Sequence, residues 1–210
     1  MAPLIRDLDP RRVADNLARV REELGRDDVQ ILAAVKYLAV EELGALAEAG
    51  ITVVGENRAQ ELEVKAAAHP ELTWDFIGQL QSRKVKQVLP RVRWIHSVAS
   101  DSALKELGKH GTAQTEVLVE VNVAGEEGKA GVLPDDLGGF IERCPVTVVG
   151  LMTMPPLAQR AEDSRRWFGA LAQLADDHGL RELSMGTSQD YAVAAQEGAT
   201  IVRLGTILYT

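Results

Sequence analysis

The sequence predicts an α/β protein, a single (β/α)8 barrel of the TIM type spanning residues 1–210, and three observations favour this fold class. Apolar, strand-like runs alternate with helix-like stretches almost without interruption, which is typical of a parallel sheet with right-handed crossovers. Eight runs and eight stretches occur, the number of each that closes a barrel. The 210 residues are enough for one large core, and this fold has a lower limit of about 200 residues.

The first expected element is a helix at 10–25, because Val13, Leu17, Val20 and Leu24 recur at helical spacing. The strands that follow should be short, apolar and buried on both faces. They are predicted at 30–35, 51–55, 73–77, 92–97, 115–122, 147–152, 182–185 and 200–204. Helices are predicted after the first seven strands, at 40–49, 57–68, 82–89, 101–110, 135–143, 160–177 and 189–197.

The leading helix should cover the gap beside the last strand, because only Ile207 to Thr210 remain after it. An open, doubly wound sheet built from the same alternation is the alternative fold.

Composition excludes several classes of function. The net charge of −8 and the pI near 5.1 argue against nucleic acid or an anionic membrane as a partner. Cys144 is the single cysteine, so an internal disulfide is impossible, which fits a reducing compartment. Residues 1–17 contain no apolar leader core, and no apolar run is long enough to span a membrane. We therefore expect a cytoplasmic protein.

Lys36 is the main candidate for chemistry. It directly follows the apolar run 31–35, so it lies at the carboxyl end of a predicted strand, where α/β folds place their ligand sites. Apolar neighbours favour the neutral amine, and a neutral amine can attack an aldehyde to form a Schiff base. The alternative is a lysine whose amine leaves the strand and lies in solvent.

Two segments near the end of the sequence predict a phosphate site. Ser188 is expected to cap the helix 189–197, whose first backbone N–H groups could bind a phosphate. In the last strand, Arg203 is followed by Gly205, which allows close backbone approach, and by Thr206, whose hydroxyl can donate to a phosphate oxygen. Taken singly, these residues could be a helix cap, a salt bridge and a turn. Together with the lysine they suit pyridoxal 5′-phosphate (PLP).

Other chemistries have no support in the residue spacing. The pair Gly128-Lys129 lacks the earlier glycine and the Ser/Thr of a phosphate loop. No dinucleotide-binding glycine motif or hydrolase serine motif occurs, and the four histidines form no metal-ligand pattern, so no metal is expected. His96, at the end of a strand, could face the site or only make a local hydrogen bond. The stretch 123–134 could be a mobile loop over the site or a solvated surface loop.

An ordered set of motifs closely resembles the pyridoxal phosphate homeostasis protein family, which is related to the barrel domain of alanine racemase (fold type III among PLP proteins). The resemblance extends over nearly the whole chain, 10–209. Its motifs are the strand ending in Lys36, Gly55-Glu56-Asn57, Phe76-Ile77-Gly78-Gln79-Leu80-Gln81 with Lys84, Ile95-His96-Ser97-Val98, Val121-Asn122 with Gly125-Glu126-Glu127 and Lys129, Gly150-Leu151-Met152-Thr153, Ser184-Met185-Gly186 with Ser188, and Arg203 with Gly205-Thr206.

The resemblance implies that PLP is the cofactor and assigns a role to six residues. They are Lys36 as the Schiff-base lysine, Ser188, Gly205 and Thr206 at the phosphate, Arg203 beside the pyridine nitrogen, and Asn57 near the ring. Four other residues depart from the family, which usually has threonine, histidine, asparagine and methionine there: Tyr37, Asp75, Arg83 and Thr187. None of the four is among the implied cofactor contacts, so the departures affect only the pocket walls and the loop after the third strand.

Two functions from different classes would use this cofactor. An amino-acid racemase needs Lys36 and a second acid/base on the opposite ring face, which alanine racemase takes from a separate domain that this chain is not expected to have. Arg203 beside the pyridine nitrogen would also disfavour ring protonation and weaken the electron sink. The resemblance and these two points favour a non-enzymatic protein that stores, delivers or buffers PLP. Its expected partners are PLP and PLP-dependent apoenzymes, and we expect a monomer. A barrel enzyme that uses a Schiff-base lysine without PLP, such as an aldolase, is a third interpretation, and it holds only if these residues do not form a phosphate pocket.

Overall fold

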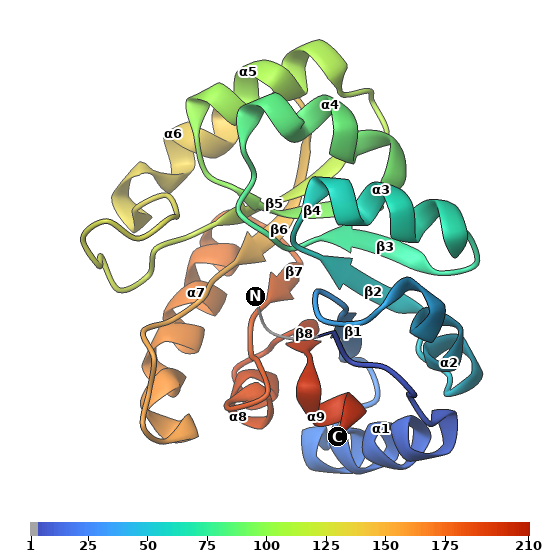
Figure 1. Cartoon of the computed structure of the whole chain (residues 1–210). Coiled ribbons are helices and arrows are strands. Elements are labelled where there is room, and N and C mark those ends of the chain that lie inside the picture. The colour runs from blue at the N-terminus through green and yellow to red at the C-terminus, as the bar shows by residue number, and fades with distance from the viewer. Residues whose placement is uncertain (1–3) are drawn as a thin grey trace.

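Eight parallel strands close into a barrel in the order β1 to β8, and β8 pairs with β1 (Figure 1). The computed structural model describes residues 4–210, so the first three residues of the expected unit 1–210, and of the stretch 1–17 searched for a leader, lie outside the described residues. The strands are β1 (Gln30–Ala34), β2 (Val53–Glu56), β3 (Thr73–Phe76), β4 (Trp94–Val98), β5 (Glu116–Glu120), β6 (Thr147–Met152), β7 (Glu182–Ser184) and β8 (Ile201–Leu204). Each overlaps its predicted run. The closed barrel is confirmed, and the open sheet is wrong.

Helices surround the barrel, and each predicted helix is present within 4–210, although several begin as a 3₁₀ turn. They are α1 (Pro10–Leu24), α2 (Leu43–Glu48), α3 (Ala59–Ala68), α4 (Val85–Val88), α5 (Asp101–His110), α6 (Leu137–Glu142), α7 (Arg165–Asp177), α8 (Tyr191–Gln196) and α9 (Thr206–Tyr209). The short helix α9 is additional to those predicted. None of the helices in this part of the chain is long and apolar enough to cross a membrane.

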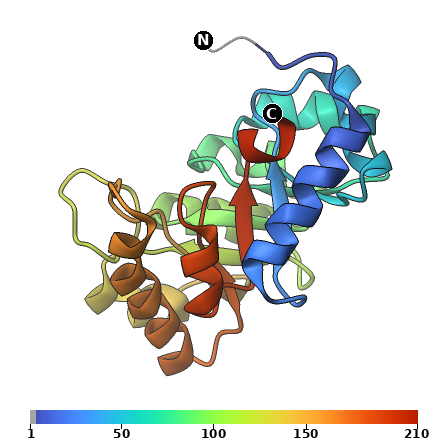
Figure 2. The ribbon, with the colours of Figure 1, turned by 90° about the horizontal axis from the view of Figure 1, so that it is seen from below.

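The leading helix α1 has clear local causes and the expected position. Asp9 caps its first turn by accepting a hydrogen bond from the Arg11 N–H, and Pro10 follows at the first helical position. Gly25 ends the helix at a φ of 63°, a left-handed conformation that glycine adopts without steric cost. Along its length α1 packs against α2, α8 and α9, and Figures 1 and 2 show it beside α9 near the C-terminus. It therefore fills the gap between α8 and α2 beside the last strand, as predicted.

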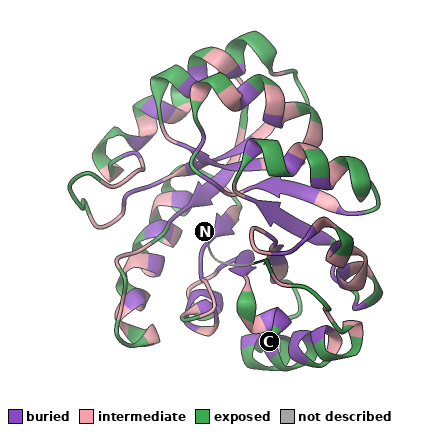
Figure 3. Ribbon diagram, in the orientation of Figure 1, coloured by how far each residue is buried: buried purple, intermediate pink, exposed green. Residues whose placement is uncertain are grey.

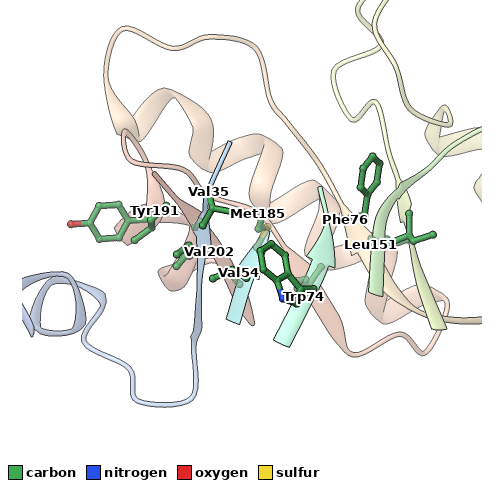
Figure 4. Packing of buried hydrophobic residues seen from close by; sticks show 14 of the residues in the cluster. Val35, Val54, Trp74, Phe76, Leu151, Met185, Tyr191 and Val202 are labelled. Carbon is green, nitrogen blue, oxygen red and sulfur yellow. The ribbon is translucent and has the colours of Figure 1, made fainter. Parts of the chain in front are cut away.

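The main hydrophobic core lies between the strands and the helices. It joins outward-facing strand residues such as Val54 and Val202 to helix residues such as Val20 and Leu46. The strands are mostly buried while the outer helix faces are exposed (Figure 3), and Val54 and Val202 pack near Tyr191 on neighbouring elements (Figure 4). This shell fixes the barrel from outside, which leaves its interior free to carry polar residues.

A small apolar cluster separate from the main core consists of Leu32, Val53 and Ile201, with Ile77 and Trp94 packed against it. Four polar or charged side chains share the interior and are also buried: Asp75, His96, Ser184 and Arg203. Gly55 leaves room for this packing, since a Cβ there would lie 2.5 Å from Leu32 Cδ2 and 2.9 Å from Ile77 Cδ1. The interior below the barrel mouth is therefore unusually polar for a packed core.

Candidate functional site

The six predicted site residues all line one cavity of about 310 Å³ at the carboxyl ends of the strands. They are Lys36, Asn57, Ser188, Arg203, Gly205 and Thr206. Parallel strands bring their carboxyl ends to the same rim, which is why residues so far apart in sequence meet. The volume is that of a small-molecule pocket. The structure thus brings the predicted residues together, while their roles toward a ligand stay predictions.

The backbone that leads to Lys36 is held by three hydrogen bonds. The Val35 N–H donates to the Gly55 carbonyl (3.0 Å), the Tyr209 hydroxyl to the Ala34 carbonyl (3.1 Å), and Lys65 Nζ to the Val35 carbonyl (2.8 Å). Both carbonyls before Lys36 are therefore fixed by side chains. This gives the otherwise flexible lysine a rigid base.

Lys65 is a positioning residue that sequence reasoning missed. Its side chain is buried and pairs with the equally buried Glu56 carboxylate at 2.7 Å. The second Glu56 oxygen accepts from the Asn57 N–H (2.7 Å), which ties the motif residue to the next site residue. The signal available in the sequence was spacing, since Lys65 recurs with Ala59 and Leu62 on the buried face of α3.

The Lys36 amine lies against an aromatic wall. Its Nζ is 4.8 Å from the ring centroid of Tyr37, the residue that replaces the family's usual threonine. Both residues line the cavity. Lys36 is half-buried, and its position at the cavity favours a pocket lysine over one that points into open solvent.

Asn57 provides an independent indication of a ligand. Its Oδ1 atom is buried and has no hydrogen-bond partner among the described residues. Buried acceptors are normally paired, so an orphaned one that lines a cavity fits a ligand carrying a donor. The backbone of Gly78 packs on Asn57 so closely that a Cβ would lie 2.1 Å from the Asn57 carbonyl oxygen, which holds the asparagine in place.

The prediction that Ser188 caps the helix is wrong. Helix α8 begins at Tyr191, and the Asp190 carboxylate instead accepts from the Thr187 N–H (2.8 Å) and from the Ser164 hydroxyl (2.9 Å). Asp190 closes the turn because its carboxylate is the stronger acceptor. Ser188 lines the cavity from within that turn.

Arg203 brings a buried positive charge to the cavity. Its Nη1 donates to Ser184 Oγ (2.6 Å), and its Nη2 to the Thr153 carbonyl (3.0 Å) and Met154 Sδ (2.9 Å). Burial lowers the pKa of Arg203 to about 10, and the charges of Glu120 and Asp190 oppose that shift. The guanidinium is therefore still charged at neutral pH. Its hydrogen-bond partners are neutral, so its charge favours an anionic ligand.

The two interpretations left open by the sequence are resolved by position. His96 is fully buried below the cavity and bonds to Asp75 and Ser184, so the local hydrogen-bond interpretation is correct. The loop 123–134 is tied to Asn122, whose Oδ1 accepts from the Glu126 N–H at 3.1 Å. No residue of that loop lines the cavity, which favours the surface-loop interpretation.

Comparison with known proteins decides the family. The family model for the alanine racemase N-terminal domain matches residues 8–210. The pyridoxal phosphate homeostasis protein of Aquifex aeolicus is 40% identical and covers 94% of both chains. The chain belongs to the pyridoxal phosphate homeostasis protein family. The resemblance predicted from the motifs is thereby confirmed.

Solved structures agree with this family and fold. PipY of Synechococcus elongatus, determined both with and without PLP, is 31% identical with a TM-score of 0.80, and the match covers 94% of this chain and 100% of PipY. Alanine racemase from Corynebacterium glutamicum is 17% identical with a TM-score of 0.73, and the match covers 96% of this chain but 61% of the racemase. The second likeness shows the shared barrel fold alone.

Proposed function

We propose that this family member binds PLP as a Schiff base on Lys36 and stores, delivers or buffers it, without efficient catalysis. The observation that carries the proposal is the cavity itself, where an amine, a buried cation and the hydroxyl-bearing residues Ser188 and Thr206 surround one small volume. PLP requires this set, since it presents an aldehyde, a phosphate and a pyridine ring. The relative PipY has been determined with PLP bound.

The ligand's phosphate would lie at Ser188, Gly205 and Thr206. The two hydroxyls can donate to phosphate oxygens, and the glycine permits close approach of the backbone. Arg203 would face the opposite end of the ring and lie beside its nitrogen. The orphaned Asn57 oxygen would accept a hydrogen bond from a polar ring substituent or from ordered water.

A carrier fits the site better than an enzyme. Bound PLP supplies an electrophilic carbon and an electron-withdrawing ring, and the charged Arg203 would keep the ring nitrogen unprotonated and thus weaken electron withdrawal. Among the described residues that line the cavity, none is a carboxylate, imidazole or thiol. The Tyr209 phenol donates to the Ala34 carbonyl, and burial raises its pKa. It therefore stays protonated at neutral pH and is not available to accept a proton. Tyr37 lies next to Lys36 rather than opposite it.

The proposal includes the chain's partners. PLP would be accepted from solution and passed to PLP-dependent apoenzymes, with the barrel acting as one monomeric unit over 1–210. Exchange of one amine for another at the aldehyde needs neither a protonated ring nor a second acid/base. The cofactor could therefore be released without the groups that a racemase requires.

The deciding experiment is chemical labelling of the purified protein. PLP-loaded protein should absorb visible light, and borohydride should fix a pyridoxyl group on the peptide that contains Lys36. The internal controls are Lys84 and Lys129, which occur in the family motifs but do not line the cavity. A label found mainly on either control lysine would defeat the assignment.

A further inference from the structure

A continuous chain of hydrogen bonds crosses the barrel interior beneath the cavity. Arg93 donates to Asp75 (Nη2 to Oδ2, 2.5 Å), and Asp75 Oδ2 lies 3.2 Å from His96 Nε2. His96 Nδ1 lies 2.8 Å from Ser184 Oγ, and Ser184 Oγ accepts from Arg203 at 2.6 Å. The chain thus links a partly exposed arginine at one end of the barrel to the cation of the cavity.

The middle of this chain is removed from water. The side chains of Asp75, His96 and Ser184 are fully buried, and Arg203 is 7% exposed. Burying so many polar groups in an interior is costly unless each is hydrogen-bonded to the next. The inside of the barrel could have been filled with apolar side chains, as it is around Leu32. These four residues therefore need an explanation beyond packing.

From Arg203 to Asp75 the hydrogen bonds of the chain point in one direction, and Arg93 donates to Asp75 from the other end. The ionised Asp75 carboxylate can only accept, so His96 Nε2 must carry a proton and donate to it. In a neutral ring Nδ1 is then the acceptor, so the Ser184 O–H donates to Nδ1 while Ser184 Oγ accepts from Arg203. Burial lowers the pKa of His96, against the raising effect of Asp75, so the ring is neutral. Burial raises the pKa of Asp75, but the hydrogen bonds from His96 and Arg93 together lower it by more. The net shift is downward, so this carboxyl is ionised at neutral pH.

We propose that Asp75, His96 and Ser184 are positioning residues that hold the Arg203 guanidinium against the ring nitrogen of bound PLP and connect it to the charge of Asp75. The inference rests on the proposed function and adds the means by which the ring environment is set. A guanidinium has five N–H groups. Three are used by Ser184, Thr153 and Met154 within the described residues, so two are left for a ligand. Because the three contacts fix the plane of the group, the direction of the remaining two is fixed as well.

The same residue types, Ser, His and Asp, form the triad of many hydrolases, but a hydrolase is excluded here by geometry. The hydroxyl of Ser184 is fully buried, so no substrate carbonyl can reach it. Its oxygen also accepts a hydrogen bond from Arg203, which occupies a lone pair and lowers its nucleophilicity. The three residues here position the Arg203 guanidinium rather than activate a nucleophile.

The first test needs no cofactor. Nitrogen-15 NMR of the histidine side chains distinguishes the two neutral tautomers from the imidazolium, and the His96 signal is assigned by its loss in His96→Gln. The chain of hydrogen bonds requires the neutral Nε2–H tautomer at neutral pH in the ligand-free protein. An Nδ1–H tautomer, or a charged ring, would overturn the proposal.

The second test measures the contact that the chain is proposed to support. The affinity for PLP is compared with that for a PLP analogue in which C–H replaces the ring nitrogen, so phosphate and Schiff-base contributions cancel in the ratio. The normal protein should prefer PLP about tenfold, the value of one charge-assisted hydrogen bond. Ser184→Ala and Asp75→Asn should each reduce this preference at least threefold, as expected of a partial loss of that bond, and Ser184→Thr, which keeps a hydroxyl, should restore it.

The matched control is Glu116→Gln. Glu116 also lies in a barrel strand and accepts from Trp94 Nε1 at 2.7 Å, but it does not belong to the chain that ends at Arg203. This substitution keeps an oxygen acceptor and should leave the preference unchanged. Equal preference in the normal protein and the Ser184 and Asp75 variants would overturn the proposal. Should Ser184→Ala fail to fold, Asp75→Asn, which lies away from the cavity, and the tautomer of the normal protein still decide it.

Failure of the proposed function would look different. In that case the normal protein would bind neither PLP nor its analogue, or borohydride would label a lysine other than Lys36. The histidine tautomer would remain a separate observation on the ligand-free protein.

Discussion

The two sides of the cavity are built in opposite ways. On the Lys36 side, the protein fixes the backbone through Lys65 and Tyr209, while no hydrogen bond among the described residues holds the amine itself. On the Arg203 side, three hydrogen bonds fix the charged group directly. A group that must exchange partners has to move, whereas a group that sets the local charge has to stay in place. The difference suits a site that captures and releases its ligand.

The largest effect is expected from removing the amine on the Lys36 side of the cavity. Lys36→Ala should abolish the visible absorption of the PLP-loaded protein, because no other cavity lysine can condense with the aldehyde. PLP should still bind, more weakly, through its phosphate. Absorption titration and equilibrium dialysis measure the two effects separately, with Lys84→Ala as the control. An unchanged absorption band in Lys36→Ala would contradict the assignment.

The second largest effect is expected from breaking the buried ion pair between Lys65 and Glu56, beneath Lys36. Lys65→Met should lower the free energy of unfolding by about 3–5 kcal/mol, because it leaves the Glu56 carboxylate buried without its partner. Combining it with Glu56→Gln should recover most of the loss, since the buried charge is then removed and the amide oxygen still accepts from the backbone. Denaturant unfolding of the three variants measures this. Equal stability of the single and double variants would contradict the role of the pair.

Much of this architecture follows from the sequence. Regular alternation predicts every strand, and the common rim of a parallel barrel predicts that residues following different strands meet, as Lys36 and Gly205 do. The prediction of the helix cap is limited because neighbouring polar residues compete for the same backbone N–H groups. Ser188 and Asp190 both precede α8, and spacing alone does not show which one closes the turn.

The hydrogen-bond chain could not be predicted for a different reason. His96 and Ser184 are 88 residues apart, and His96 and Asp75 are 21 apart, on strands whose inward faces meet only when the barrel closes. The available signals were a histidine inside a strand motif and an aspartate where the family usually has histidine. Neither signal indicates its partner, because charge pairing across a barrel depends on register rather than on local sequence.

Comparing PLP with pyridoxal separates the contribution of the phosphate contacts from that of the Schiff base, because both ligands carry the aldehyde. Pyridoxal, which has no phosphate, should bind about 10²–10³-fold more weakly than PLP, because charge-assisted hydrogen bonds of about 1.5–3 kcal/mol each are missing. Thr206→Val should weaken PLP binding about tenfold, the value of one such bond, and leave pyridoxal binding unchanged. Fluorescence or absorption titration of both ligands measures this. Equal affinities for PLP and pyridoxal would rule out the phosphate site.

Acid should lower the free energy of unfolding through His96 and Asp75, the buried titratable groups beneath the Arg203 side. The folded-state pKa of His96 lies below its ordinary value of 6.5, so below pH 6.5 the unfolded chain binds a proton that the folded chain does not. The free energy of unfolding should therefore fall as the pH decreases from 6.5. The lowered pKa of Asp75 adds to this at lower pH, since its contribution is present above 3.8 and is lost as the pH falls. Urea unfolding from pH 7.5 to 4 should show a shallower slope for His96→Gln, and a slope equal to that of the normal protein would count against a neutral His96.

The smallest expected effect is on catalysis. Racemisation needs a protonated, electron-withdrawing ring and acid/base groups on both faces of the substrate carbon. The guanidinium of Arg203 would work against the first requirement. The described residues that line the cavity include no carboxylate, imidazole or thiol to act as a second acid/base, and lacking one typically costs a factor of about 10²–10⁴ in rate.

The PLP-loaded protein should therefore exchange the Cα hydrogen of L-alanine with deuterium far more slowly than the ordinary enzyme range of about 1–10³ per second. Mass spectrometry of the recovered alanine and chiral chromatography measure exchange and inversion. The informative variant is Arg203→Gln, which removes the charge beside the ring and should raise the exchange rate while inversion stays slow, since a second acid/base is still missing. Rapid inversion by the normal protein would put the racemase first, and it would show that a fixed cation at the ring does not by itself prevent the chemistry.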